Sequence, residues 1–181
     1  MKFKATWSTL LIVMTVLSIP IFLGFPFFIA YLTASIAQEA KPPPPILIPL
    51  LETLGILMPA ILVICSLFTV RGYTLLADAI LVKRLFWETR VSLDGLRSAT
   101  FEPNVKGVFD FNTLAMNGCY AFAGLFWNRK LGSHRAYVTN FAHTVVLRFE
   151  NRTVVLSPDP PEQFVSEVLK NRGIGSENER E

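Results

Sequence analysis

Two aromatic residues and four basic residues are the strongest candidates for a binding function. They are Lys83, Arg84, Phe126, Trp127, Arg129 and Lys130. Aromatic rings beside cations suit the surface of a lipid bilayer, where rings lie at the boundary and cations meet phosphate. The same groups suit an acidic surface on a partner protein. An alternative interpretation places Tyr120, Phe122 and Gly124 in a core strand, with Arg129 and Lys130 in a solvated turn.

Residue types used in catalysis and metal binding are few and scattered. The two histidines, His134 and His143, have no Cys, Asp or Glu at a metal-ligand spacing, and Cys119 has no histidine near it in the sequence. The glycines form neither a phosphate-binding loop nor a dinucleotide fingerprint. We therefore expect a protein that is not an enzyme, with no catalytic residue, no cofactor and no metal.

Two apolar runs precede the part of the chain that carries these candidates. The chain has 181 residues, of which 51% are hydrophobic and 17% are charged, which is too apolar for one ordinary soluble domain. A membrane span needs about 20 apolar residues. We expect transmembrane helices over about residues 9–31 and 51–70. A cleaved signal peptide is the alternative for the first run, although that run is far longer than such peptides require.

The basic residues around the two runs predict the orientation of the chain. Lys2 and Lys4 precede the first run, Arg71 follows the second, and Lys41 alone lies between them. Because basic residues concentrate on the cytoplasmic side, we expect a two-span protein of the cell membrane with both termini cytoplasmic. The external loop would cover residues 38–45, with four consecutive prolines that favour an extended strut.

Two features inside the apolar runs need separate interpretation. Pro20, Gly24 and Pro26 predict a bend in the first helix. Glu52 is an ionisable residue in an apolar run, for which the usual functional interpretation is an ion pathway. We instead expect Glu52 in the outer headgroup layer, because residues 53–70 are uncharged and nearly long enough to span by themselves.

The remainder of the chain alternates short apolar segments with turn residues and predicts a mainly β domain. Seven strands are expected, over residues 73–76, 79–83, 90–93, 96–101, 135–139, 144–149 and 153–157. A final amphipathic helix is expected from Pro160 to about Asn171, capped by Asp159. Its apolar face would carry Phe164 and Val168. The layout predicts a partly open barrel of about seven strands with a helix over one end.

Three stretches resemble the bacterial pleckstrin-homology (PH) domain family. They are Gly-Leu-Phe-Trp-Asn-Arg-Lys-Leu-Gly at 124–132, Arg-Ala-Tyr-Val-Thr at 135–139 and Ser-Pro-Asp-Pro at 157–160. The resemblance implies a PH-like fold over residues 72–172 and suits a membrane-anchored member, with residues 1–71 as a transmembrane hairpin. Residues 173–181 form an acidic tail that we expect to be disordered.

These observations predict a membrane-anchored PH-like binding or adaptor module that faces the cytoplasm. Its specific ligand would be a protein, with weak contact to anionic lipid of the bilayer. The alternative is a structural subunit of a membrane complex assembled through the hairpin, followed by an enzyme that acts on lipid or envelope material. The net charge of +3 is too small and too scattered to predict nucleic acid as a partner.

Overall fold

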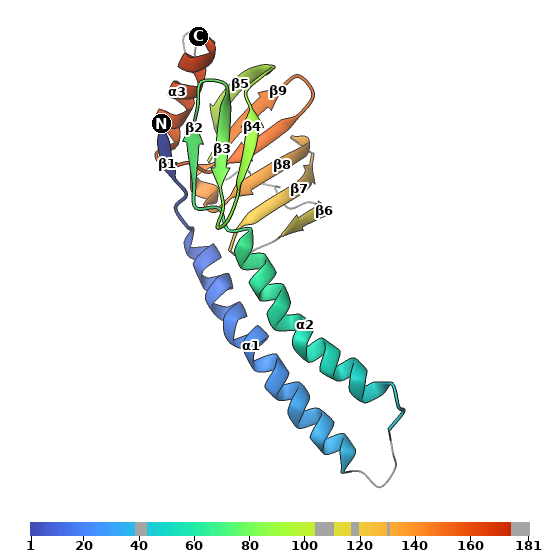
Figure 1. Cartoon of the computed structure of the whole chain (residues 1–181). Helices are drawn as coiled ribbons and strands as arrows, with labels where there is room; N and C mark the ends of the chain where they lie inside the picture. The colour runs from blue at the N-terminus through green and yellow to red at the C-terminus, as the bar shows by residue number, and fades with distance from the viewer. Residues whose placement is uncertain (39–42, 104–110, 117–119, 130, 175–181) are drawn as a thin grey trace.

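Two long helices extend from the β domain (Figure 1), and they carry most of the exposed large hydrophobic side chains of the described residues. The structure, a computed structural model, describes residues 1–38, 43–103, 111–116, 120–129 and 131–174. Helices α1, Thr9–Ala37, and α2, Leu47–Leu67, are both long and apolar enough to cross a membrane. Phe27 in α1 and Ile56 in α2 are 78% and 73% exposed. A core helix of a soluble protein would bury such side chains, so these two helices need a cover other than water.

The two predicted spans are found as helices with different ends. Helix α1 begins at the predicted residue, where the Ser8 hydroxyl caps it by accepting a hydrogen bond from the Leu11 amide at 3.2 Å. It continues past residue 31 to Ala37 and is not interrupted at its two prolines. Helix α2 begins earlier than predicted, at Leu47, and ends earlier, at Leu67. Part of the connection at 38–45 lies outside the described residues.

Two β-sheets form a sandwich at one end of the helix pair (Figure 1). The first sheet has the order β1-β2-β3-β4, with β1 Lys2–Lys4, β2 Gly72–Leu75, β3 Ala79–Lys83 and β4 Glu88–Ser92. The second has the order β5-β9-β10-β8-β7-β6, with β5 Leu96–Phe101, β6 Phe111–Met116, β7 Phe122–Asn128, β8 Gly132–Val138, β9 Val145–Phe149 and β10 Thr153–Leu156. Neighbouring strands are antiparallel except β8 and β10. The described strands form no closed barrel.

The predicted mainly β fold with two apolar helices before it and one helix after it is confirmed. The seven predicted strands correspond to β2–β5 and β8–β10, with small shifts at their ends. Strands β1 and β6 were not predicted, and β7 corresponds to the core strand through Phe122 and Gly124 that was considered only as an alternative. Lys2 and Lys4, which the sequence assigned to the flank of a membrane helix, instead lie in β1 and pair with Thr74 and Gly72. The first residues of the chain therefore belong to the β domain.

Helix α3, Pro161–Arg172, covers one side of the sandwich. It begins with Pro160 as the N-cap, so the prediction of Asp159 as the capping residue is wrong. The Asp159 amide instead donates a hydrogen bond to the Lys4 carbonyl at 3.0 Å, which ties the start of the helix to β1. The predicted apolar face is buried as expected: the Phe164 ring lies 5.0 Å from the Phe3 ring, between centroids.

A buried hydroxyl network joins the two sheets. The Tyr73 hydroxyl of β2 donates a hydrogen bond to the Tyr137 carbonyl of β8 at 2.5 Å and accepts one from the Ser157 amide at 3.2 Å. The Ser157 hydroxyl in turn accepts a hydrogen bond from the Thr139 amide at 2.9 Å. Burial raises the pKa of Tyr73 to about 12, although the bonds from Ser157 act in the opposite direction. The hydroxyl is therefore protonated at neutral pH.

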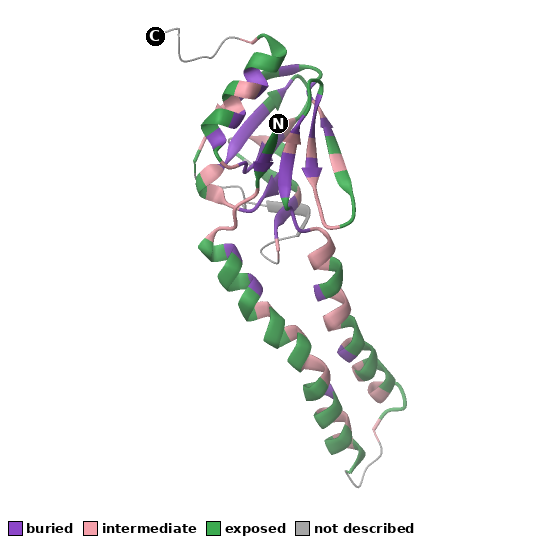
Figure 2. Cartoon of the chain, turned by 60° about the vertical axis from the view of Figure 1, so that its left-hand side comes forward, coloured by how far each residue is buried: buried purple, intermediate pink, exposed green. Residues whose placement is uncertain are grey.

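The first turns of α1 pack against the outer face of the second sheet. Leu11 is fully buried against Phe122, Phe126 and neighbouring residues, and the Thr15 hydroxyl accepts a hydrogen bond from the Tyr120 amide at 3.2 Å. At 1.5 Å per residue, the 29 residues of α1 span about 43 Å, which exceeds the roughly 30 Å of a bilayer core. The excess length carries α1 into the domain, whereas the rest of both helices stays largely exposed (Figure 2).

Candidate functional site

The tip of the β3–β4 hairpin lies against the end of α2. The four residues 84–87 form a turn in which the Arg84 amide donates a hydrogen bond to the Trp87 carbonyl at 2.9 Å. At its base, the Lys83 Nζ lies 3.5 Å from Glu88 Oε1 across the paired strands. The Phe68 ring, next to the last residue of α2, meets the Trp87 ring edge-on at 5.2 Å between centroids. The tip is therefore fixed at the boundary between the apolar helices and the β domain.

Arg84 is held among three aromatic rings at this boundary. Its guanidinium carbon lies 5.2 Å from the ring centroid of Phe68, 5.8 Å from that of Trp87 and 5.4 Å from that of Tyr137. Such contacts stabilise a cation by about 0.5–2 kcal/mol. Its Nε and Nη1 atoms are buried and have no hydrogen-bond partner among the described residues.

The charge on Arg84 persists despite this environment. Burial lowers the pKa of Arg84, and the interaction with Tyr137 opposes that shift. An arginine begins from so high a pKa that the guanidinium remains charged in neutral solution. The site thus contains a half-buried cation, and a guanidinium group can bind phosphate oxygens through the part of it that reaches the surface.

The turn also presents apolar surface beside this cation. Phe86 is 77% exposed and Trp87 is 38% exposed. Aromatic side chains of this kind are favoured where one end of the ring is in an apolar layer and the other is in a polar one. The sequence did not predict either residue as part of the site. Two adjacent aromatic residues in a hairpin turn, where polar residues are usual, are the signal that identifies them.

The structure separates the six residues that the sequence grouped as candidates. Lys83, the last residue of β3, and Arg84, the first residue of the hairpin tip, are adjacent. Phe126 is fully buried and stacks on His134, with ring centroids 6.0 Å apart, so the prediction that it contacts lipid or a partner is corrected to a core role. Trp127, in β7, is 43% exposed, and Arg129 is exposed in the turn after that strand. Lys130 lies outside the described residues.

The two predicted clusters do not form one site. Tyr137, which contacts Arg84, pairs with Ala123 of β7, whereas Trp127 pairs with Ser133. Ser133 and Tyr137 are four positions apart, which corresponds to about 13 Å along β8. The hairpin tip is therefore a site of its own, and the far end of β7 lies to one side of it.

Other groups that the sequence singled out have structural surroundings of their own. Glu52 lies in the second turn of α2 and lines a cavity of about 500 Å³ between the two helices, beside Gly55 and Ile29. His134 is 2% exposed, and its Nδ1 lies 3.0 Å from the Gly132 carbonyl oxygen. Within the described ranges, no group of three or more His, Cys, Asp and Glu side chains has an arrangement that could hold a metal ion.

Comparison with known families places the domain. A family model described as "Bacterial PH domain" matches residues 71–172, which is more than half of the chain. The match begins at the residue before β2 and ends with the last residue of α3, so it covers the sandwich without β1 and the two apolar helices. Comparisons with curated proteins and with solved structures give no match.

Proposed function

The chain belongs to the bacterial PH domain family, and from that premise we propose that it is a membrane-anchored binding module rather than an enzyme. The two apolar helices hold the domain at the cytoplasmic face of the cell membrane. The hairpin tip at residues 84–87 contacts anionic lipid weakly and orients the domain, and the specific ligand is another protein. Family membership supports a binding or adaptor role, whereas fold alone does not identify the ligand.

The position of the hairpin tip is the observation that carries the lipid part of this proposal. The tip is attached to Phe68, directly after α2, so a bilayer around α2 would place its headgroup layer at the level of the tip. Arg84 would then meet lipid phosphate while Phe86 enters the boundary region. Each basic group near an anionic surface contributes about 1 kcal/mol, so the contact orients the domain without acting as a strong anchor.

Tryptophan fluorescence tests this contact in the intact chain. The chain contains Trp7, Trp87 and Trp127. Replacing Trp7 and Trp127 with Phe leaves Trp87 as the only tryptophan, and replacing Trp7 and Trp87 leaves Trp127. In vesicles that contain brominated lipid, we expect strong quenching of Trp87 and much weaker quenching of Trp127. Equal quenching of the two, or none of Trp87, would contradict lipid contact by the hairpin tip.

The cytoplasmic orientation is supported by the distribution of basic residues. Lys2, Lys4 and Arg71 lie at the domain end of the helix pair, whereas Lys41 falls in the sequence between the two helices. In a variant without the native cysteines, an impermeant maleimide applied to intact cells should label a cysteine placed at Lys41 and not one placed at Arg172. Labelling of the second position from outside would reverse the proposed orientation.

Exchange of the helices distinguishes an adaptor from a subunit that assembles through its hairpin. Residues after Thr15 in α1 and the body of α2 can be replaced by an unrelated hairpin, which preserves the buried contacts of Leu11 and Thr15 with the domain. If the domain binds the partner, proteins crosslinked to the native chain in mild detergent should also be recovered with the exchanged chain. Their complete loss would favour the subunit function.

A further inference from the structure

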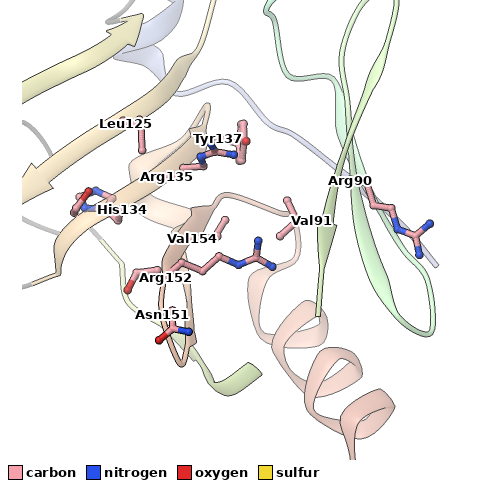
Figure 3. Close-up of a pocket in the computed structure, with 11 residues that line it drawn as sticks. Arg90, Val91, Leu125, His134, Arg135, Tyr137, Asn151, Arg152 and Val154 are labelled. Atoms are coloured by element: carbon pink, nitrogen blue, oxygen red, sulfur yellow. The ribbon is translucent and has the colours of Figure 1, made fainter. Parts of the chain in front are cut away.

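The side of the sandwich opposite α3 contains a cavity of about 400 Å³ (Figure 3). It lies between β4 of the first sheet and β7, β8 and β10 of the second. Apolar side chains form part of its lining, namely Val91, Leu125, Tyr137 and Val154. Small-molecule sites typically have volumes of about 300–1,000 Å³ and a mostly apolar lining with a few polar groups. The cavity has the size and the apolar component of such a site.

Two arginines supply its charge. Arg135 of β8 and Arg152, just before β10, extend into the space between the sheets (Figure 3). A third arginine at the edge, Arg90, points away from the cavity and pairs with Asp78. No acidic side chain is among the described residues that line the cavity. The charge of Arg135 and Arg152 is therefore not neutralised from within the cavity.

The neighbours of Arg135 on the sheet make this arrangement unusual. Its cross-strand partners are Leu125 on β7 and Val154 on β10, and both are apolar. Arg152 lies two residues before Val154, the β10 partner of Arg135, so both arginines are on the same face of the second sheet. No hydrogen bond or ion pair joins the Arg135 side chain to any part of the chain that the structure describes.

Arg152 is fixed more firmly than Arg135. Its Nη2 donates a hydrogen bond to the Ser92 carbonyl at the end of β4, at 2.8 Å, and its guanidinium lies 4.6 Å from the ring centroid of Phe149. This contact spans the two sheets and leaves further guanidinium donors for another acceptor. Arg152, which is positioned by these contacts, and Arg135, which has no hydrogen bond or ion pair to the described residues, thus lie on the same cavity wall.

We propose that this cavity binds an organic anion in which a phosphate or carboxylate group is attached to an apolar body. The oxyanion would lie between Arg135 and Arg152, whose planar guanidinium groups match phosphate and carboxylate geometry. The apolar body would cover Leu125, Val91 and Val154. The anion would also remove the repulsion between two like charges that no carboxylate of the described lining offsets. This site goes beyond the function proposed above and does not use the hairpin tip.

Phenyl phosphate tests the site in the full-length chain in neutral-detergent micelles. Trp127 lies on the same face of β7 as Leu125, so a variant with Trp127 as its only tryptophan reports on occupancy. We expect a saturable fluorescence change with phenyl phosphate and much weaker changes with phenol or inorganic phosphate, which each lack one half of the ligand. Absence of a saturable change with phenyl phosphate would overturn the proposal.

Substitutions locate the binding. Arg135→Gln should weaken phenyl phosphate binding by about tenfold or more, because one charge-assisted bond is lost. Arg152→Lys keeps the charge and should weaken it less. Arg97→Gln removes a charge from an exposed pair with Glu150, outside the cavity, and should leave binding unchanged. Equal affinity in the Arg135 and Arg97 variants, with melting temperatures near that of the native chain, would overturn the proposal.

A nanodisc experiment separates the two sources of such an anion. If phosphatidic acid in the surrounding bilayer prevents phenyl phosphate from binding, the site takes a lipid headgroup. If binding is unaffected by phosphatidic acid, the site takes a soluble ligand. Either result upholds the anion site. The outcome is also independent of Trp87 quenching, so failure of this site and failure of the proposed lipid contact are distinguishable.

Discussion

The two sides of the β sandwich differ in what lies over them. On one side α3 places Phe164 against Phe3 of β1 and Tyr73 of β2, and both Phe164 and Val168 are fully buried. On the other side Arg135 and Arg152 line a cavity between β4 and β8. The first arrangement removes apolar area from water and stabilises the fold. The second places like charges together at a cost to stability, which is the usual mark of a surface kept for binding rather than for folding.

Charges introduced under α3 should have the largest effect. Replacement of both Phe164 and Val168 by Asp puts two carboxylates without partners into the core, at a cost of about 3–5 kcal/mol for each position. Because a domain is stabilised by only about 5–15 kcal/mol in total, the double variant should be largely unfolded. Circular dichroism of the full chain in micelles measures this. Leu125→Asp, on the side that carries the cavity, is the control and should keep the native melting temperature within a few degrees.

If the double variant kept the melting temperature of the native chain, the packing of α3 on the sandwich would not be needed for stability. The contrast between the two sides would then be lost, because both would tolerate charge.

The contact of α1 with the domain should give the next largest effect. Leu11→Ala removes a fully buried side chain from the outer face of the second sheet and should cost about 2–5 kcal/mol. Ile12 is the next residue on the same helix and is 46% exposed. Ile12→Ala should therefore change stability by less than about 1 kcal/mol. Denaturant unfolding of both variants in the same detergent provides the comparison, and similar losses would show that α1 only anchors the chain.

Alkaline pH should weaken the buried hydroxyl network. Because the pKa of Tyr73 in the folded state is raised to about 12, from a usual value near 10, its stabilising effect is complete below about pH 10 and is lost as pH rises toward 12. The linked loss is about 3 kcal/mol at most. Tyr73→Phe should cost about 1–2 kcal/mol at neutral pH and should flatten the decrease of unfolding free energy above pH 10. An equally steep decrease in the variant would assign the alkaline effect to other groups.

The sequence predicted best those elements whose signal lies within their own residues. The long apolar runs needed only composition, and the face of α3 needed only helical spacing. Strand β1 could not be found in this way, because three residues acquire their structure from pairing with β2, about seventy positions later in the chain. Two of the three are lysines, which the charge pattern alone assigns to a membrane flank.

The prediction of contact residues was correct about the exposure of Trp127 and wrong about that of Phe126, although the two are neighbours in β7. Successive side chains of a strand point to opposite faces, and the outer face of a sheet usually meets water. Here the first turns of α1 cover the outer face, so Phe126 is buried, whereas Leu125 and Trp127 on the inner face remain partly exposed beyond the first sheet. The face of the second sheet that is covered depends on the excess length of α1, and the local sequence around residue 126 cannot predict it.

The smallest expected effect gives the sharpest test of the side that carries the cavity. If Arg135 serves binding, its replacement by Leu should raise the stability of the domain, and if Arg135 supports the fold, the same replacement should lower it. If Arg135 serves binding, Arg135→Leu removes repulsion from Arg152 and adds apolar contact with Leu125 and Val154. The variant should then be more stable than the native chain by about 0.5–1 kcal/mol. The difference should shrink as salt is raised, since salt screens the repulsion. Denaturant midpoints at low and high salt measure both quantities.

The matched control is Arg97→Leu, which breaks an exposed pair with Glu150 and should be neutral or slightly destabilising. Phenyl phosphate should raise the midpoint of the native chain and not that of Arg135→Leu, because a ligand stabilises only the state that binds it. If Arg135→Leu is instead less stable at low salt, then Arg135 supports the fold as Phe164 does. The side with the cavity would then stabilise the fold through polar contacts, as the side under α3 does through apolar contacts. The distinction between a side that serves stability and a side that serves ligand binding would no longer hold.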